Sequence, residues 1–353
     1  MKHYAGLDIS MKEAALCIVD QEGKVIYEKT LPLEPDVIFN HLTIRVDSIE
    51  SVGIETGSMT RWLTLELRKL DINAIAIDAR KMSGLLKFNC NKNDKNDAKG
   101  IANAMRTNMY KEVYVKSDKN ALLSALVSTR TSLVNQRSKN LVTIRGHLKS
   151  LGIRLSRLSH KNASEILDLI EVKLPKHLEM SIKSLANTVV AINEEVSKLN
   201  ESIKEFVKEN KVAQNIQTIS GVGPIVTAAY IIEIGDPLRF SSSRSVGGYF
   251  GLTPRLYESG GTSVMGRISK FGRSSVRSLL YQAAHCMLTR SKKRSKLKDW
   301  GMKIWKKKGL KKASVAVARK LAVIMHKMLI TGEDFNDNIF IEVDADKKKV
   351  VTA

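Results

Sequence analysis

The sequence predicts an α/β domain at the N-terminus, followed by a long helical hairpin and a mainly α-helical C-terminal domain. Three observations lead to this prediction. Short apolar runs separated by turn residues fill the first part of the chain, an apolar heptad repeat fills the middle, and longer helical runs alternate with Gly-rich segments afterwards. The predicted domains span residues 1–115, 116–210 and 211–353.

Within the first domain the expected element order is β-β-β-α-β-α-β-α. The runs YAGLDI, AALCIVD and KVIYEKT are typical of three consecutive antiparallel strands. SVGIET and NAIAIDA indicate buried strands, whereas PDVIFNHLTIR, MTRWLTLELRKL and the segment that begins at Asp94 indicate helices. This order matches an RNase H-like (RuvC-like) domain, which is a mixed sheet with helices on its faces.

The middle of the chain predicts two long helices. Apolar residues recur at helical spacing from about Ala121 to Leu155. After Pro175, spacings of four and three alternate through four heptads, which favours a coiled coil. The repeat consists of Leu178, Ile182, Leu185, Val189, Ile192, Val196, Leu199, Ile203 and Phe206. A coiled coil predicts a homo-oligomer, a dimer or tetramer; a plain helical bundle without such a role is the alternative.

The last domain combines helices with Gly-rich segments. TISGVGPIVTAAYIIEIGD resembles a helix-hairpin-helix, in which turn amides at Gly221 and Gly223 face a backbone phosphate, although a plain helical turn is the alternative. GGYFGLTPRLYESGGTSVMGRISKFG is expected to be irregular. SSVRSLLYQAAHCML and KKASVAVARKLAVIMHKML are expected to be helices.

The charge of the chain indicates a polyanionic partner. The 353 residues carry a formal net charge of +22, and Lys and Arg side chains displace counterions condensed on phosphate. Nucleic acid is therefore the expected partner, with an anionic membrane surface as the alternative. No run of about 20 apolar residues occurs and MKHYAGLDIS is not a signal peptide, so a cytoplasmic protein, associated with the nucleoid when on DNA, is expected.

The three cysteines predict neither a disulfide framework nor a zinc site. Cys17, Cys90 and Cys286 are isolated in the sequence and form no Cys-x-x-Cys pair. His285 adjoins Cys286, a spacing that does not suit a shared set of ligands on a helix. A structural role is expected for both residues.

A basic stretch from Arg290 to Lys312 holds twelve Lys and Arg residues against one acid, Asp299. It is interrupted by Trp300 and Trp305. Such a concentration of positive charge favours nucleic-acid binding. A solvated basic face with the tryptophans as core anchors is the alternative.

Four acids form the candidate catalytic site. Asp8 lies in the first strand and Glu55 ends the fourth, and these strands are neighbours in an RNase H-like sheet. Asp94 and Asp97, at helical spacing i, i+3, share one helix face. Carboxylates that converge repel one another unless a cation lies among them, and their oxygens suit Mg²⁺ or Mn²⁺. Asp78 is a weaker candidate.

Two simpler interpretations remain for the helical pair of acids. Asp94 or Asp97 can be an N-cap, or a first-turn acid favoured by the helix dipole. An acid within a buried strand, by contrast, is costly unless it is paired. That cost favours a functional role for Asp8 and Glu55.

Ordered motifs give the sequence a family resemblance. GLDIS, IETGS, NDKNDA, SGVGPIVTAAYIIEIGD, GYFGLTP, ESGG, GRISKFG and ARKLAVIMHKML occur in the order of the DEDD-type insertion-sequence transposases. These are relatives of the Piv DNA invertase and include the bridge-RNA-guided recombinases. The resemblance covers nearly the whole chain, from Tyr4 to about Leu329.

The resemblance implies a DNA transposase or site-specific recombinase that cuts and rejoins DNA. It implies metal ligation by Asp8, Glu55, Asp94 and Asp97, and a nucleophilic serine that matches Ser259. Glu258 stands where the family commonly has a preceding serine. The resemblance also implies guidance by a structured RNA of the element, and metal assistance to the serine from another domain or subunit.

The residues alone support Ser259 less strongly. Ser-Gly-Gly gives an exposed hydroxyl on a small-residue loop, but a serine needs activation to attack. Ser241 to Ser243 are rivals, for which capping of the next helix is the expected role. Two further hypotheses stay open: a metal-dependent, Holliday-junction resolvase-like endonuclease that needs only the acids, and a non-catalytic nucleic-acid-binding protein.

Predicted nucleic-acid contacts are basic residues and turn glycines. They are Lys92, Lys95, Lys99, Gly221, Gly223, Arg255, Arg267, Lys270, Arg273, Arg277, Lys292, Lys293, Arg294, Lys306 and Lys307.

Overall fold

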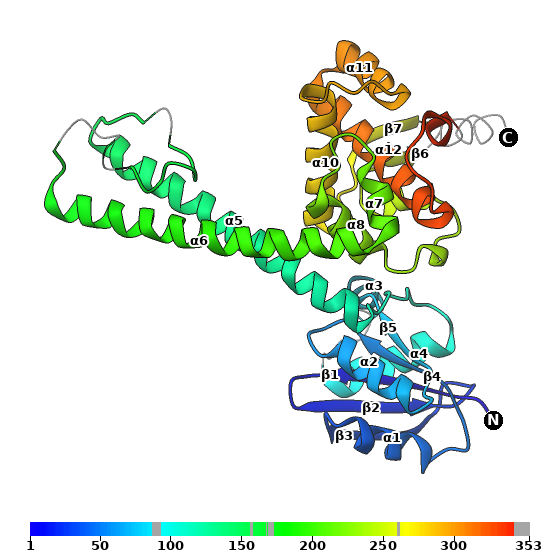
Figure 1. Ribbon diagram of the computed structural model, residues 1–353. Helices are drawn as coiled ribbons and strands as arrows, with labels where there is room; N and C mark the ends of the chain where they lie inside the picture. The colour runs from blue at the N-terminus through cyan, green and yellow to red at the C-terminus, as the bar shows by residue number, and fades with distance from the viewer. Residues whose placement is uncertain (87–92, 156–157, 167, 169–172, 260–261, 342–353) are drawn as a thin grey trace. The chain divides into compact units, whose positions relative to one another are not determined.

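The computed structural model describes residues 1–86, 93–155, 158–166, 168, 173–259 and 262–341 (Figure 1). By its internal contacts the chain divides into two compact units, Met1–Ser117 and Asp118–Ala353. Within the described residues, no helix combines the length and the apolar character needed to cross a bilayer.

The first unit is a mixed five-stranded sheet with helices (Figure 1). The strand order is β3-β2-β1-β4-β5, with β1, β2 and β3 antiparallel and with β4 parallel to both β1 and β5. The predicted elements are confirmed, and α3 is an additional helix. This arrangement is compatible with an RNase H-like domain. The elements are β1 (His3–Ile9), β2 (Glu13–Val19), β3 (Val25–Pro32), α1 (Pro35–Thr43), β4 (Ile49–Glu55), α2 (Thr60–Lys69), β5 (Ala74–Ile77), α3 (Ala79–Leu86) and α4 (Asp94–Arg106).

Helix α4 packs on the two central strands through a pair of glycines. Gly6 of β1 and Gly53 of β4 are register partners. A Cβ atom on Gly6 would lie 2.2 Å from the carbonyl oxygen of Ala98, and one on Gly53 would lie 2.7 Å from the side chain of Met105. Atoms do not approach so closely, so only glycine lets the backbone of α4 rest on the sheet at this point.

The second unit begins with the two predicted long helices, α5 (Asp118–Ser150) and α6 (Lys176–Glu209). Arg130 donates from Nε to Oδ1 of Asn200 at 3.1 Å, and Arg137 donates from Nη1 to Oδ1 of Asn193 at 2.8 Å. The two contacts advance seven residues along α5 and go back seven along α6, so the helices are antiparallel neighbours (Figure 1).

The predicted apolar seam of α6 is buried or half-buried along its length. Its N-terminal part shares a core with the end of α5, where Ile144 and Leu148 are buried. Helix α5 ends at Ser150, before the predicted end at Leu155, because Gly152 turns the chain with a φ of 77°. Whether the pair acts as a coiled coil in an oligomer stays a prediction.

The rest of the second unit is mostly helical, as predicted. Helix α12 lies at its centre, with α10 and α11 against it (Figure 1). Most of its residues are buried in the core that the helices share. The elements are α7 (Lys211–Gln217), α8 (Pro224–Ile234), the short 3-10 helix η1 (Pro237–Arg239), α9 (Ser245–Tyr249), β6 (Pro254–Ser259), β7 (Thr262–Ile268), α10 (Ser274–Thr289), α11 (Lys296–Lys308) and α12 (Leu310–Thr331).

The expectation of an irregular Gly-rich segment after residue 247 is wrong. Strands β6 and β7 form an antiparallel hairpin. Its strands contain Leu, Tyr, Thr, Val and Ile, which favour extended backbone, and the Gly-Gly pair between them is typical of a hairpin connection. That pair, residues 260–261, lies outside the described residues.

The turn between α7 and α8 is present, and its two glycines have different surroundings. Gly221 has a φ of 86°, and a Cβ atom there would lie 2.6 Å from the carbonyl oxygen of Ala283 on α10. Gly223 precedes α8, and a Cβ atom there would meet open space. Gly221 is therefore required for packing, whereas a phosphate contact at either glycine stays a prediction.

We predict that Gly6→Ala weakens the attachment of α4 to the sheet. The added methyl group would collide with the backbone of Ala98, and overpacking of this kind costs about 1–3 kcal/mol. Hydrogen exchange of α4 amides in the full-length protein should accelerate accordingly. Gly84→Ala on α3, where a Cβ atom meets nothing within 4 Å, is the matched control. Equal exchange of α4 in both variants would contradict the packing argument.

Candidate active site

The strand register brings Asp8 and Glu55 to the same level of the sheet. Leu7 of β1 is paired with Ile54 of β4, so the next residues of these parallel strands are Asp8 and Glu55. Both acids are half-buried. Each lies two residues after a glycine that contacts α4, and side chains two apart point to the same face of a sheet. The two carboxylates therefore belong to the face that α4 covers.

The direction of α4 places its first turn at the same end of the sheet. At the other end of the helix, Arg106 donates from Nη1 to the carbonyl oxygen of Gln21 at 3.2 Å, just beyond the end of β2. Because β2 is antiparallel to β1, that contact lies beside the start of β1. Asp94 and Asp97, in the first turn, therefore lie toward the end of β1 that carries Asp8.

Neither acid of α4 is its N-cap. Asn93 occupies that position, and its Oδ1 accepts from the amide of Asn96 at 2.7 Å. The N-cap interpretation of Asp94 and Asp97 is therefore wrong, although both are first-turn acids. Asp97 is half-buried and Asp94 is exposed.

The acids are on one side of the first unit but do not form a closed metal site. In the part of the chain that the structure describes, no three Asp, Glu, His or Cys side chains stand close enough together to hold a metal ion. The donor set, consisting only of carboxylate oxygens, nevertheless fits a hard divalent cation such as Mg²⁺.

Asp78 has a local structural role. Its Oδ1 accepts from the amide of Arg80 at 2.9 Å, which satisfies one of the first amides of α3. Its position after β5 is separated from β1 by β4. This agrees with its lower rank as a catalytic candidate.

Ser259 ends strand β6, next to the tip of the β6/β7 hairpin. It is paired with Thr262 and is exposed, as is every residue of β6. A bulky substrate can therefore reach its hydroxyl.

The expected capping role of Ser241 to Ser243 is wrong. Helix α9 has Arg244 as its N-cap, without a side-chain cap. Ser243 instead lies 2.9 Å from Nδ1 of His326, whose Nε2 lies 3.0 Å from the carbonyl oxygen of Pro237. A carbonyl only accepts, so Nε2 carries the proton and Nδ1 accepts from Ser243.

His326 is a buried, neutral histidine that sequence reasoning missed. It is fully buried, and this burial is the main reason that its pKa is lowered; its hydrogen bond to Pro237 acts in the opposite direction. Ser243 and His326 are 83 residues apart, so no local spacing could reveal the pair.

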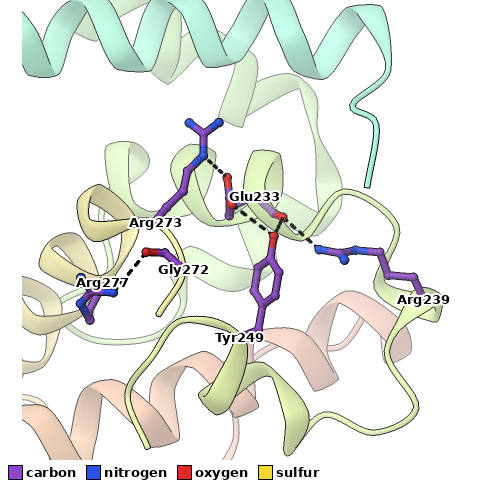
Figure 2. A network of polar contacts seen from close by, with 6 residues as sticks. All are labelled: Glu233, Arg239, Tyr249, Gly272, Arg273 and Arg277. Atoms are coloured by element: carbon purple, nitrogen blue, oxygen red, sulfur yellow. Dashed lines mark hydrogen bonds and ion pairs between the residues drawn. The ribbon is translucent and has the colours of Figure 1, made fainter. Parts of the chain in front are cut away.

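Two predicted phosphate contacts have partners inside the second unit (Figure 2). Arg273 donates from Nε to Oε2 of the buried Glu233 at 3.1 Å. Tyr249 lies 3.2 Å from Oε1 of Glu233, and its pKa is raised by burial and by this carboxylate. Arg277 Nη1 lies 3.0 Å from the carbonyl oxygen of Phe271 and 3.4 Å from that of Gly272. These contacts hold α10 and the loop before it to α8.

The other predicted contacts lie on accessible surfaces. Lys95 and Lys99 are exposed on α4, beside the acids. Arg255, Arg267 and Lys270 are exposed on or after the β6/β7 hairpin, and Arg255 donates to the carbonyl oxygen of Ser269. Lys92 lies outside the described residues. Exposed cations before and at the end of α11 are Lys292, Lys293, Arg294, Lys306 and Lys307.

The tryptophans of the basic stretch are core anchors. Trp300 and Trp305 are half-buried and pack against the core of the second unit. They fix α11 so that its lysines face outward. Anchoring by the tryptophans leaves the exposed lysines of α11 available for nucleic-acid binding.

The two cysteines that the structure describes form no disulfide. Cys17 and Cys286 are free. Burial, with a smaller effect from Glu28, raises the pKa of Cys17 to about 11, so its thiol is protonated at neutral pH. Cys90 lies outside the described residues.

Comparison with known proteins defines the class of this chain. Residues 5–153 match a transposase family model of the DEDD, IS110 type, and residues 213–299 match the model of the transposase IS116/IS110/IS902 family. These matches, with the acid-bearing sheet, define a DEDD transposase, an enzyme of DNA transposition. The chain belongs to the IS110 family of these enzymes.

Two relatives illustrate this membership. The transposase for insertion sequence element IS1111A of Coxiella burnetii is 29% identical over 336 residues, covering 94% of this chain and 90% of that protein. The transposase for insertion sequence element IS1328 of Yersinia enterocolitica is 28% identical over 249 residues, covering 70% of this chain and 74% of that protein.

We predict that His326 makes the protein less stable in mild acid. Its pKa in the folded chain lies below the ordinary value of 6.5, so the unfolded chain takes up a proton first as the pH falls. The contribution of the neutral His326 to the free energy of unfolding is complete above about pH 6.5 and is lost as the pH falls below it. In His326→Gln the unfolding temperature should fall less between about pH 7.5 and 5.5 than in the parent.

His147→Gln, at an exposed histidine of α5, is the control and should follow the parent curve. Parallel curves for His326→Gln and the parent would contradict the assignment of a buried, neutral His326.

Proposed function

We propose that this transposase cuts and rejoins DNA at the ends of its insertion sequence with two groups of residues. One is the acid set Asp8, Glu55, Asp94 and Asp97, and the other is Ser259. The observation that carries the proposal is the register of β1 and β4, which sets Asp8 level with Glu55. The direction of α4, whose first turn lies toward this end of the sheet, supports the inclusion of Asp94 and Asp97. The family membership of the chain supports it.

The acid set would hold Mg²⁺ or Mn²⁺. Bound there, the cation would act as a Lewis acid on the phosphodiester oxygens. Asp8 and Glu55 come from strands, which fix their positions. Asp97, half-buried on α4, is the better placed of the two helical acids, whereas the exposed Asp94 completes the set or orients its neighbour.

Ser259 would act as the nucleophile. Its Oγ forms a bond to the phosphorus of the cleaved phosphodiester, and the bond from phosphorus to one deoxyribose oxygen breaks. The serine proton passes to a base, and the departing oxygen takes up a proton. Rejoining reverses the exchange with the hydroxyl of the new strand, so the energy of the ester bond is retained without ATP. The exposure of Ser259 supports this role over the half-buried Ser243, whose hydroxyl is bound to His326.

Further parts of the proposal concern partners. A structured RNA of the element would guide the enzyme to DNA, which the charge of +22 accommodates. A dimer or tetramer would form through α5 and α6, where Leu122, Val142 and Met180 are exposed apolar residues. In functional terms the chain would comprise a catalytic domain at 1–115, a helical region at 116–210 and a second transposase domain at 211–353.

We predict that Ser259→Ala abolishes a covalent protein–DNA adduct. The assay uses a plasmid with the element and its flanks, Mg²⁺ and denaturing gels. Asp8→Asn and Glu55→Gln should lower cleavage by on the order of 10²–10³, and EDTA should remove it. Ser243→Ala is the control and should keep the adduct.

Each outcome has a distinct meaning. An adduct that persists in Ser259→Ala but not in Ser243→Ala would identify Ser243 as the nucleophile. Cleavage without any adduct, dependent on Asp8, would favour the metal-dependent endonuclease. Cleavage that is unchanged in Asp8→Asn would refute the metal site.

We predict that lysines before α11 and the arginines of α10 behave differently. Lys292→Ala/Lys293→Ala should weaken binding to duplex DNA and lower the slope of log K against log salt by about 0.9 per lysine. Arg277→Ala should mainly lower the unfolding temperature, because backbone carbonyls lose their donor. Fluorescence anisotropy and thermal unfolding measure the two effects. An Arg277→Ala protein with full stability and a reduced salt slope would show that Arg277 contacts DNA instead.

A further inference from the structure

A cavity of about 740 Å³ lies in the second unit. Its walls are the root of the β6/β7 hairpin, helix α11 and helix α12, together with Arg244. A volume of this size is typical of small-molecule sites. Seven of its fifteen lining residues are Lys or Arg, and none of these described lining residues is acidic. This lining favours an anionic ligand.

Two arginines of the lining favour an anion most directly. Nη2 of Arg244 is buried and has no hydrogen-bond partner among the described residues. Arg319 keeps much of its surface exposed, but its pKa is lowered, first by partial burial and then by the neighbouring charge of Arg244. Both arginines line the same cavity, and an anion bound there would reduce the repulsion between their charges.

The position of Arg319 is fixed by the backbone of α9. A Cβ atom on Gly247 would lie 3.2 Å from Cγ and 3.3 Å from Nε of Arg319. The stem of the arginine therefore lies against the glycine. The cationic pair is a built feature of the fold, because α9 and α12 must pack in this way to hold it.

An apolar wall completes the cavity. It includes Leu252 and Ile268 at the hairpin root, and Trp300 and Ile304 on α11. An inorganic anion would not need this wall, and an apolar peptide would not need the arginines. A nucleotide fits both, because its base is a flat, largely apolar ring and its phosphate is an anion. The cavity is too small for a duplex, so the nucleotide must be unpaired.

We propose that this cavity binds one unpaired nucleotide of the nucleic acid that the transposase handles, with the phosphate at Arg244 and Arg319 and the base against Trp300 and Ile304. The inference rests on the proposed function, because that function makes nucleic acid the ligand. The cavity lies at the root of the hairpin that carries Ser259 near its tip. Ser259 follows Pro254 by five residue steps along β6, a distance of about 17 Å. A strand anchored here would continue toward Ser259.

The test measures binding without cleavage. All proteins are full-length, carry Ser259→Ala and are kept in EDTA. The probes are fluorescent single strands of about ten nucleotides, one with bases and one abasic throughout. Ala316→Trp fills the cavity without altering its charge, since Ala316 lines it. Arg319→Gln removes one guanidinium, and Lys311→Gln, which removes an exposed charge of α12 outside the lining, is its matched control.

The variants should distinguish the contribution of the base to binding from that of the phosphate. Ala316→Trp should lower the affinity for the normal strand about tenfold and leave the abasic strand unchanged. Arg319→Gln should lower the affinity for both strands about tenfold, against about twofold for Lys311→Gln. The proposal would be overturned if Ala316→Trp bound the normal strand within about twofold of its parent. Equal effects of Arg319→Gln and Lys311→Gln would also overturn it.

A crosslinking experiment tests the same site if the Ala316→Trp variant does not fold. A strand with 5-iodouracil, irradiated on the parent protein, should crosslink to Trp300, as mapped by mass spectrometry. Crosslinks only elsewhere would overturn the proposal. DNA and RNA versions of each strand identify which nucleic acid supplies the nucleotide. Because metal and nucleophile are absent throughout, these results stand whether or not the cleavage proposal fails.

Discussion

The close packing of α4 on the paired glycines of β1 and β4 is the constraint on which the candidate catalytic site depends. The backbone of α4 lies directly against Gly6, and the side chain of Met105 on α4 fills the space over Gly53. Two residues further along each strand, the side chains reappear as Asp8 and Glu55. The close approach therefore ends where the acids begin, and the first turn of α4 lies above them. A bulkier residue at either glycine would lift the helix and separate its acids from those of the sheet.

Much of this first unit could be predicted from the sequence, because its signals are local. Strand alternation, short turns and a helix start are encoded in neighbouring residues. The adjacency of Asp8 and Glu55 followed once the element order indicated β1 beside β4, a relation that the register confirms. The N-cap interpretation of Asp94 and Asp97 was wrong because of one neighbouring residue. Asn93, immediately before them, provides the cap.

The second unit was harder to predict, because its decisive contacts join residues far apart in the sequence. Ser243 was expected to cap a nearby helix, yet its partner is His326 on α12. Glu233 lies within an apolar run of the sequence, which gives no sign of its partners. It is buried, pairs with Arg273 and accepts a hydrogen bond from Tyr249. The β6/β7 hairpin was missed because its glycines were interpreted as irregular backbone. The spacing of residue types along the sequence indicates the structure of one helix or strand. It does not indicate which helices and strands contact one another.

The positive charge of the chain therefore does not form a single surface with a single role. Several arginines bind oxygen atoms of the protein itself: Arg130 and Arg137 tie α5 to α6, and Arg277 holds carbonyls at the start of α10. The planar guanidinium suits this task, because it donates along several fixed directions. The lysines around α11 extend into solvent on flexible stems, which suits non-specific contact with phosphate.

Arg244 and Arg319 differ from both groups. They are arginines that line one cavity, and one buried nitrogen of Arg244 is unpartnered among the described residues. A fold that keeps two such charges together gains stability when an anion binds between them, so the ligand and the packing of α9 on α12 support each other.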